Sequence, residues 1–187
     1  MSKLKVLEKF KVEELRIALE LNRDCLEGAY SEDIIGQKYA IILTKEGKIS
    51  ITGAMDLDCE TWGCFKGNEI EIGRIVISNN NVEMEKVINQ VVNNVKRLKV
   101  YELIYSLLRC DYSSKIIADE ELKGEFIYKD KRYGFYVDVE DEFGWFVELN
   151  EIIDGNYDPI ECSNCERGDY EGLLVECSHL LKRELLT

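Results

Sequence analysis

Residues 69–108 constrain the fold of this chain more than any other segment. A strand-like run at residues 69–78 leads through three asparagines into an amphipathic helix at residues 82–98, whose apolar side chains recur at helical spacing. That helix leads into a second expected strand at residues 101–108. Because a strand, a helix and a second strand form the core of many α/β and α+β proteins, the sequence predicts an α+β fold.

Local patterns predict the remaining elements. In chain order they are a helix at residues 10–26, a hairpin formed by residues 38–44 and 49–52, a short helix at residues 111–122, and a second hairpin formed by residues 126–128 and 133–137. The only proline, Pro159, follows a polar segment that contains Gly155. This segment predicts a loop between the main domain and a C-terminal appendage.

The charge of the chain is unevenly distributed. Its 187 residues include 24 Lys and Arg against 37 Asp and Glu, which gives a net charge of −13. Residues 140–187 contain 13 of the acidic residues and three basic ones. We therefore divide the chain into a nearly balanced domain at residues 1–139 and an acidic appendage at residues 140–187. The acidic excess argues against nucleic-acid binding, which depends on Lys and Arg contacts to phosphate.

The sequence also bears on the compartment. Charged residues interrupt the N-terminal segment where a signal peptide needs a continuous apolar stretch, and no run reaches the roughly 18 apolar residues of a membrane span. We expect a cytoplasmic protein without a membrane partner. Its seven cysteines are then expected to be reduced thiols or metal ligands.

Four residues near the C-terminus form the strongest chemical pattern. Cys162 and Cys165 have the Cys-x-x-Cys spacing with which two thiolates reach one zinc ion, and Cys177 and His179 would complete a tetrahedral set. This site needs residues 172–177 to be extended, because residues two apart on a helix point about 200° away from each other. Bound zinc would also stabilise a short acidic segment.

Two alternatives to this site are open. Apolar residues at helical spacing favour one amphipathic helix over residues 169–186, with Cys177 as a small buried residue. A different metal site would join Cys162 and Cys165 to Cys59 and Cys64, which bracket a predicted turn.

The element order resembles that of the GNAT family of N-acetyltransferases over residues 12–139. The resemblance implies a mixed central sheet flanked by helices, and acetyl-CoA as the cofactor. It implies that Ile75, Val76 and Ile77 line the pantetheine and that Asn79, Asn80 and Asn81 occupy the position of the phosphate loop. The glycine-containing loop motif of the family does not occur between Ser78 and Lys86.

The same resemblance gives two candidate catalytic residues. Glu71, on the central strand, would deprotonate the acceptor amine if its carboxylate faced a cleft. The family uses a tyrosine to protonate the leaving thiolate, and Tyr112 is the nearest tyrosine to that position. The function expected is therefore an acyl-CoA-dependent N-acyltransferase acting on a small amine or a protein, or a non-catalytic relative.

A second function belongs to a different class. The acidic C-terminal element, with or without zinc, would engage a protein partner in a module that is not an enzyme. A third interpretation is that the acidic segment imitates nucleic acid and occupies a basic protein surface. Binding of CoA separates the first function from the other two.

Overall fold

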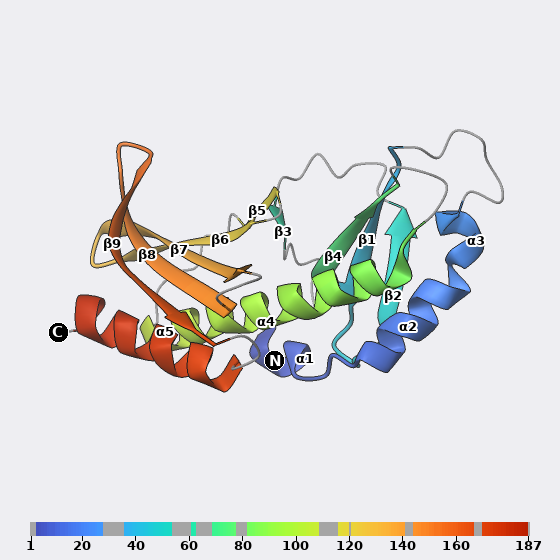
Figure 1. Cartoon of the computed structure of the whole chain (residues 1–187), viewed down its shortest axis with the longest axis horizontal. Coiled ribbons are helices and arrows are strands. Elements are labelled where there is room, and N and C mark those ends of the chain that lie inside the picture. Colours follow the sequence, from blue (N-terminus) through green and yellow to red (C-terminus); the bar gives the residue numbers. More distant parts are fainter. Residues whose placement is uncertain are drawn as a thin grey trace. The chain divides into compact units, whose positions relative to one another are not determined.

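The computed structural model describes residues 3–27, 36–53, 61–62, 69–77, 82–108, 116–119, 121–140, 144–166 and 170–186. Within these ranges the chain is an α+β protein with two antiparallel sheets (Figure 1). Its internal contacts divide it into two compact units, residues 1–95 and residues 96–187. The mixed sheet that the GNAT resemblance implies is not found among the described strands, because every described pairing within a unit is antiparallel.

The elements have the following bounds. The helices are α1 (Lys3–Leu7), α2 (Val12–Leu21), α3 (Arg23–Leu26), α4 (Met84–Leu108) and α5 (Tyr170–Leu185). The strands are β1 (Lys38–Leu43), β2 (Ile49–Gly53), β3 (Thr61–Trp62), β4 (Ile70–Val76), β5 (Ile116–Asp119), β6 (Glu121–Tyr128), β7 (Lys131–Glu140), β8 (Gly144–Ile153) and β9 (Asn156–Cys165).

The first unit contains a three-stranded sheet in the order β2-β1-β4. The hairpin of β1 and β2 is confirmed, and the N–H of Thr44 donates to the carbonyl oxygen of Lys48 at 2.9 Å across its turn. The first half of α4 packs on β4 at Gly73, where an added Cβ would lie 2.7 Å from Cγ2 of Val91. Glycine is therefore needed for this close approach of helix and strand. The predicted first helix is confirmed as α2 and α3, with a break at Asn22.

The predicted strand at residues 101–108 is wrong, because α4 continues through it to Leu108. Leu98, Tyr101, Ile104 and Leu108 are all buried and follow one another at spacings of three or four. That spacing places them on one side of a helix. The helical spacing of buried residues therefore continues through residues 101–108, where the sequence predicts a strand.

The predicted short helix at residues 111–122 is also wrong in its described part. Residues 116–119 form β5, and β6 begins at Glu121, with Ala118 paired to Leu122 across the turn. Gly124, two residues beyond the predicted helix, lies inside β6, where the ring of Tyr101 packs against it. Residues 109–115 and residue 120 lie outside the described ranges.

The sheet of the second unit has the strand order β5-β6-β7-β8-β9. The predicted hairpin of β6 and β7 is confirmed, and its turn residues Lys129 and Asp130 both have positive φ, 49° and 60°. These values suit the two-residue turns that match the twist of antiparallel strands. The fold continues across the predicted domain boundary, because β7 pairs with β8 from Tyr133 to Glu140.

The loop predicted around Pro159 is wrong. Asp154 and Gly155, with φ of 51° and 83°, make a tight turn that joins β8 directly to β9. Pro159 lies within β9, the last strand in the order of the sheet, where a missing backbone N–H need not break a pairing. A shift of register between Leu149 and Asn150 accommodates it.

Candidate functional site

The carboxylate of the candidate base Glu71 already has an ion-pair partner within the first unit. It is 4% exposed, and a register shift between Ile41 and Ile42 places a bulge in β4 next to it. Residues three apart on a regular strand lie on opposite faces, but the bulge brings Glu71 and Arg74 to the same face. The Arg74 guanidinium holds both carboxylate oxygens of Glu71, through Nε and through Nη2 at 3.3 Å. Glu71 is therefore held as half of a buried ion pair.

The residues expected along the pantetheine do not share one environment. Ile75 and Ile77 are buried, with 4% and 1% of their surface exposed, whereas Val76 is 55% exposed. The backbone N–H of Ile77 donates to Gln37 at 3.0 Å, and its carbonyl accepts from Gly36 at 2.7 Å. Both backbone groups of Ile77 therefore already have hydrogen-bond partners within the first unit. Asn79, Asn80, Asn81 and Tyr112 lie outside the described residues.

A hollow of about 360 Å³ lies between α2 and the start of α4 in the first unit. Ile17 and Ile88 contribute apolar surface to it. Its charged groups are mutually paired: Arg16 binds Glu85, with Nη2 at 3.1 Å from Oε2, and Arg23 binds Glu20 at 2.6 Å. Because each guanidinium already has a carboxylate, the hollow has no excess positive charge for a phosphate.

The structure does not bring the four predicted zinc ligands together. Helix α5 is continuous through Cys177 and His179, so the extended segment that this site requires is absent from the described chain. Cys177 is fully buried and His179 is exposed. Burial, together with the neighbouring Cys165, raises the pKa of the Cys177 thiol far above its ordinary value. A thiol with so high a pKa is a poor source of the thiolate that zinc requires.

The other two predicted zinc ligands, Cys162 and Cys165, are also kept apart. Cys162 pairs with Glu148 and Cys165 pairs with Trp145, and residues three apart on this strand lie on opposite faces of the sheet. Cys59 and Cys64 lie outside the described residues, so the alternative metal site stays a prediction. Within the described ranges, no three His, Cys, Asp or Glu side chains are grouped as metal ligands would be.

The two helices of the second unit pack on the same face of its sheet, which we call the covered face. From α4, the Tyr101 hydroxyl donates to the carbonyl oxygen of Phe135 at 3.0 Å, and the Lys96 ammonium lies 5.5 Å from the Trp145 ring centre. From α5, Glu176 accepts from Ser163 and Arg183 binds Glu161. The members of the covered face include Phe126, Tyr133, Phe135, Val137, Trp145, Val147, Leu149, Glu161, Ser163 and Cys165.

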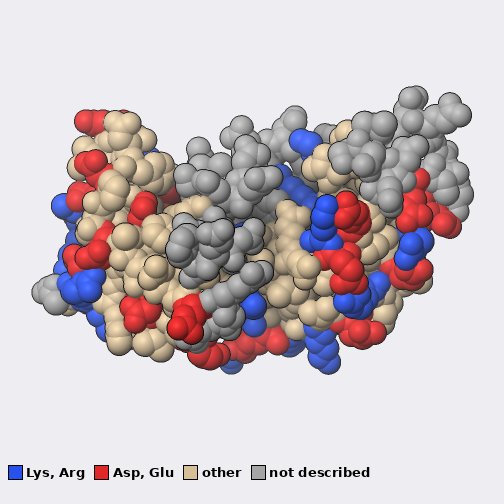
Figure 2. Space-filling view, viewed as in Figure 1, with Lys and Arg blue, Asp and Glu red and all other residues tan. Residues whose placement is uncertain are grey.

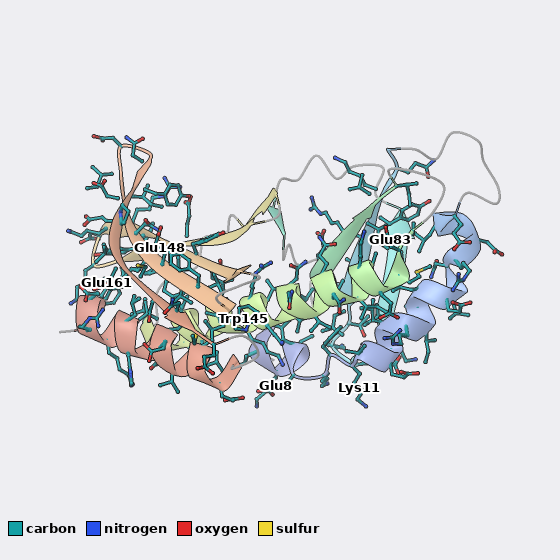
Figure 3. The ribbon with its side chains drawn as sticks, viewed as in Figure 1. Glu8, Lys11, Glu83, Trp145, Glu148 and Glu161 are labelled. Atoms are coloured by element: carbon teal, nitrogen blue, oxygen red, sulfur yellow. The ribbon has the colours of Figure 1, made fainter. Side chains whose placement is uncertain are left out.

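The opposite side of the same strands is the open face, on which no helix within the described part of the second unit packs. Its members, which follow from the pairing register, include Glu125, Ile127, Arg132, Gly134, Tyr136, Phe146, Glu148, Asn150, Ile152, Tyr157, Pro159, Cys162 and Asn164. Figure 3 labels Glu148 on β8, and Trp145 and Glu161, which belong to the covered face.

A three-residue cluster crosses one end of the open face. The Tyr157 hydroxyl donates to Oε1 of Glu125 at 2.5 Å, and the Arg132 guanidinium binds Oε2 of the same carboxylate. The Tyr157 ring occupies the space above Gly134, where an added Cβ would lie 2.5 Å from Cε1 of the ring. Partial burial and the Glu125 carboxylate raise the pKa of Tyr157 to about 12. Tyr157 is therefore a protonated donor throughout the physiological range.

Next to this cluster lies a buried amide, that of Asn150. Asn150 is 3% exposed, and its Oδ1 has no hydrogen-bond donor among the described residues. It is paired across the sheet with Gly134 on one side and Pro159 on the other, neither of which has a polar side chain. A buried acceptor without a donor costs about 1–3 kcal/mol, so the position calls for an explanation.

Two aromatic rings and a carboxylate continue the open face beyond Asn150. The Tyr136 and Phe146 ring centres are 6.2 Å apart in an edge-on arrangement, and both side chains are half-buried. Glu148, half-buried and directly paired with Tyr136, has no ion-pair partner in the part of the chain that the structure describes. Next to the buried Asn150, they form a surface that offers negative charge and aromatic faces.

Sequence reasoning missed this cluster and the adjoining Asn150, because the four residues come from four strands. Glu125 and Arg132 flank a predicted hairpin turn, so their ion pair could have been expected from the sequence. Tyr157 lies in the segment that predicts a loop, and Asn150 lies in the predicted acidic appendage, for which the sequence predicts no strand. No local pattern in that segment indicates the register on which their positions depend.

Comparisons with known proteins assign this arrangement to no group: no family model, no curated protein and no solved structure matches the chain. None of the described helices combines the length and the apolar character needed to cross a membrane.

Proposed function

We propose that this protein is an interaction module, not an enzyme, and that its second unit binds a basic segment of a partner protein. The observation that carries the proposal is the open face of the second sheet. Both helices of the unit lie on the covered face, while the open face has aromatic and apolar side chains at its surface, among them Ile127 at 49% and Tyr157 at 36% exposure. Aromatic side chains beside polar groups are typical of protein interfaces.

Charge supports a basic partner. The described residues of the second unit include 16 acidic side chains and nine basic ones. Acidic side chains are spread over this part of the surface (Figure 2). Such an excess attracts a basic partner and disfavours an acidic one.

A charge-reversal series tests the proposal. The probe is a labelled nine-residue peptide of arginine, lysine, serine and glycine, and its affinity for the full chain is measured by fluorescence anisotropy in physiological salt. Glu148→Lys on the open face should weaken binding by at least about tenfold, since it replaces an attraction by a repulsion at the site. Two matched controls, Glu171→Lys on α5 and Glu8→Lys in the first unit, make the same change of net charge at exposed positions.

Equal losses in all three variants would show that the peptide senses only the overall charge, and would overturn the proposal. Absence of binding to the unmodified chain would also overturn it. Binding that falls only with Glu148→Lys supports it.

One observation favours the acyl-CoA-dependent N-acyltransferase as a second candidate. In the described sheet β4 is an edge strand that runs toward α4, the order in which the GNAT resemblance places the pantetheine and the phosphates. Against this candidate, residues 101–108, which the sequence predicts as the strand after the helix, are helical. Acetyl-CoA at 100 times its Kd should raise the free energy of unfolding by about 2.7 kcal/mol if this candidate is right. No shift in melting temperature would exclude it.

A further inference from the structure

We infer that the outer edge of β2 is a self-association surface, at which β2 of one copy of the chain pairs antiparallel with β2 of a second copy. The inference is independent of the proposed function, because it concerns the first unit. It begins from the sheet order β2-β1-β4, in which β2 is an edge strand (Figure 1). Within the described residues, β1 is the one strand that pairs with β2.

The pairing with β1 shows which backbone groups of β2 point outward. The N–H of Thr44 donates to the carbonyl oxygen of Lys48 at 2.9 Å, so these two residues form a hydrogen-bonded pair. Hydrogen-bonded and non-hydrogen-bonded pairs alternate along an antiparallel ladder. The N–H and C=O groups that point away from β1 therefore belong to every second residue of β2, namely Ile49, Ile51 and Gly53. No hydrogen bond to these groups is found among the described residues.

The edge of β2 has none of the features that keep edge strands from pairing. Edges are commonly protected by proline, by charged side chains or by a bulge. β9 carries Pro159 and a shift of register, and β4 carries a bulge next to the charged Glu71 and Arg74. β2 has the sequence Ile-Ser-Ile-Thr-Gly, without a proline or a charged residue, and its register with β1 is regular throughout. Its edge can therefore accept a further strand.

The sequence of β2 favours a second copy of the same strand in that position. In an antiparallel pairing with a twofold axis at Ile51, this residue faces its own copy and exchanges hydrogen bonds with it in both directions. Ser50 then faces Thr52 of the second copy, and Ile49 faces Gly53 of the second copy. Hydroxyl side chains that face each other form hydrogen bonds across a pair of strands, and no like charges meet. The strand is therefore complementary to itself.

The exposure of the side chains agrees with such a pairing. Ser50 and Thr52 are exposed, and alternation places them on the face opposite to that of Ile51. Ile51 is half-buried and paired with Ile41, on the face that α4 covers through Val91. Five paired residues give about six backbone hydrogen bonds and an interface below the standard size of about 1,600 Å². The dimer is therefore expected to be weak and reversible.

The test is sedimentation velocity of the full chain at concentrations from about 2 to about 200 μM. Ser50→Lys/Thr52→Lys places lysine opposite lysine twice across the twofold axis, whereas Ser50→Lys/Thr52→Glu places lysine opposite glutamate twice. We expect the first double variant to raise the Kd of the dimer at least about tenfold, and the second to lower it. The first makes the net charge of −13 less negative by two, which by itself would favour association, so a loss reports the local contacts.

A mixing experiment adds a positive signal. Ser50→Glu/Thr52→Glu should repel itself as the double lysine variant does, and the two mixed together should form a heterodimer through lysine–glutamate pairs. An unmodified chain that stays monomeric at every concentration would overturn the inference. Equal dimerisation of the lysine–lysine and lysine–glutamate variants would overturn it as well.

Urea denaturation at low concentration checks that each variant is folded. Because both positions are exposed, the midpoint of unfolding should stay close to that of the unmodified monomer. If the double lysine variant is unfolded, the lysine–glutamate variant decides: tighter self-association than that of the unmodified chain supports the inference, and weaker or equal self-association overturns it.

Discussion

Tyr157 on β9 donates a hydrogen bond of 2.5 Å to Glu125 on β6, so the last strand of the second sheet is joined to a strand three positions away. Neighbouring strands are about 4.8 Å apart, which separates these two strands by roughly 14 Å along the sheet. The two side chains together cross the open face and pass over Gly134, the open-face residue that has no side chain. This bond therefore links β6 and β9 across the two strands that lie between them.

Removing this bond should destabilise the protein. Tyr157→Phe leaves the 94% buried Glu125 with Arg132 as its remaining partner. We expect the free energy of unfolding to fall by about 1–2 kcal/mol, because the lost bond ends on a charged group and the tyrosine is partly exposed. Urea denaturation of the full chain measures it. Tyr39→Phe is the matched control, since the Tyr39 hydroxyl donates to Gln37 at an exposed site and its loss should cost under about 0.5 kcal/mol.

The same tyrosine predicts a loss of stability at alkaline pH. Burial first, and then the bond to Glu125, raise the pKa of Tyr157 from 10.0 to about 12. The unfolded chain therefore loses this proton before the folded chain does, so the contribution is complete below pH 10 and is lost as pH rises toward 12. Between pH 9 and pH 11.5 the wild-type chain should lose about 1 kcal/mol more than Tyr157→Phe, a value reduced for the partial exposure of the ring. Equal losses would contradict the assigned environment.

Packing of α4 on β4 can be tested at Gly73. An added Cβ would lie 2.7 Å from Cγ2 of Val91, so Gly73→Ala should destabilise the protein by about 1–3 kcal/mol through overpacking. Val91→Ala frees that space, and the double variant should be less destabilised than the sum of the two single variants. Gly53→Ala is the control, since its nearest heavy atom is Cε1 of Tyr39 at 3.8 Å. Simple additivity of the two changes would contradict this contact.

The parts of the fold that could be predicted from the sequence are those set by short-range pattern. The hairpin of β1 and β2 follows from a turn with glycine between two apolar runs. The end of α4 could not be predicted in the same way, because the run from Tyr101 to Leu108 has apolar residues that fit both a strand and a helix. Tertiary packing decides it: Tyr101 reaches Gly124 and Phe135, which lie far along the chain.

The candidate site was less predictable than the fold. Cys162 and Cys165 have the spacing of metal ligands, yet the strand on which they lie turns them to opposite faces. Which residues lie on the open face depends on the register in which β6, β7, β8 and β9 pair. That register includes a shift between Leu149 and Asn150, which is set by the pairing of β8 with β9 and cannot be found in either segment alone. The burial of Asn150 between Gly134 and Pro159 follows only from that register.

The cysteines of the second unit should differ widely in reactivity. Cys162 is exposed on the open face, whereas Cys177 is fully buried against the sheet and burial raises the pKa of its thiol. Because the thiolate is the reactive form, we expect Cys177 to react with an aromatic disulfide reagent at pH 7.5 at least about 100-fold more slowly than Cys162. The measurement is the release of coloured thiolate from the native chain, repeated in denaturant.

Two variants assign the reactions to their residues. Cys162→Ser should remove one rapid equivalent from the native protein, whereas Cys177→Ala should remove none until the chain is unfolded. Loss of a rapid equivalent in Cys177→Ala would contradict the buried position of this thiol on α5. It would also reopen the predicted zinc site, because a thiol that a reagent reaches readily in the native chain has the access and the thiolate character that a metal ligand needs.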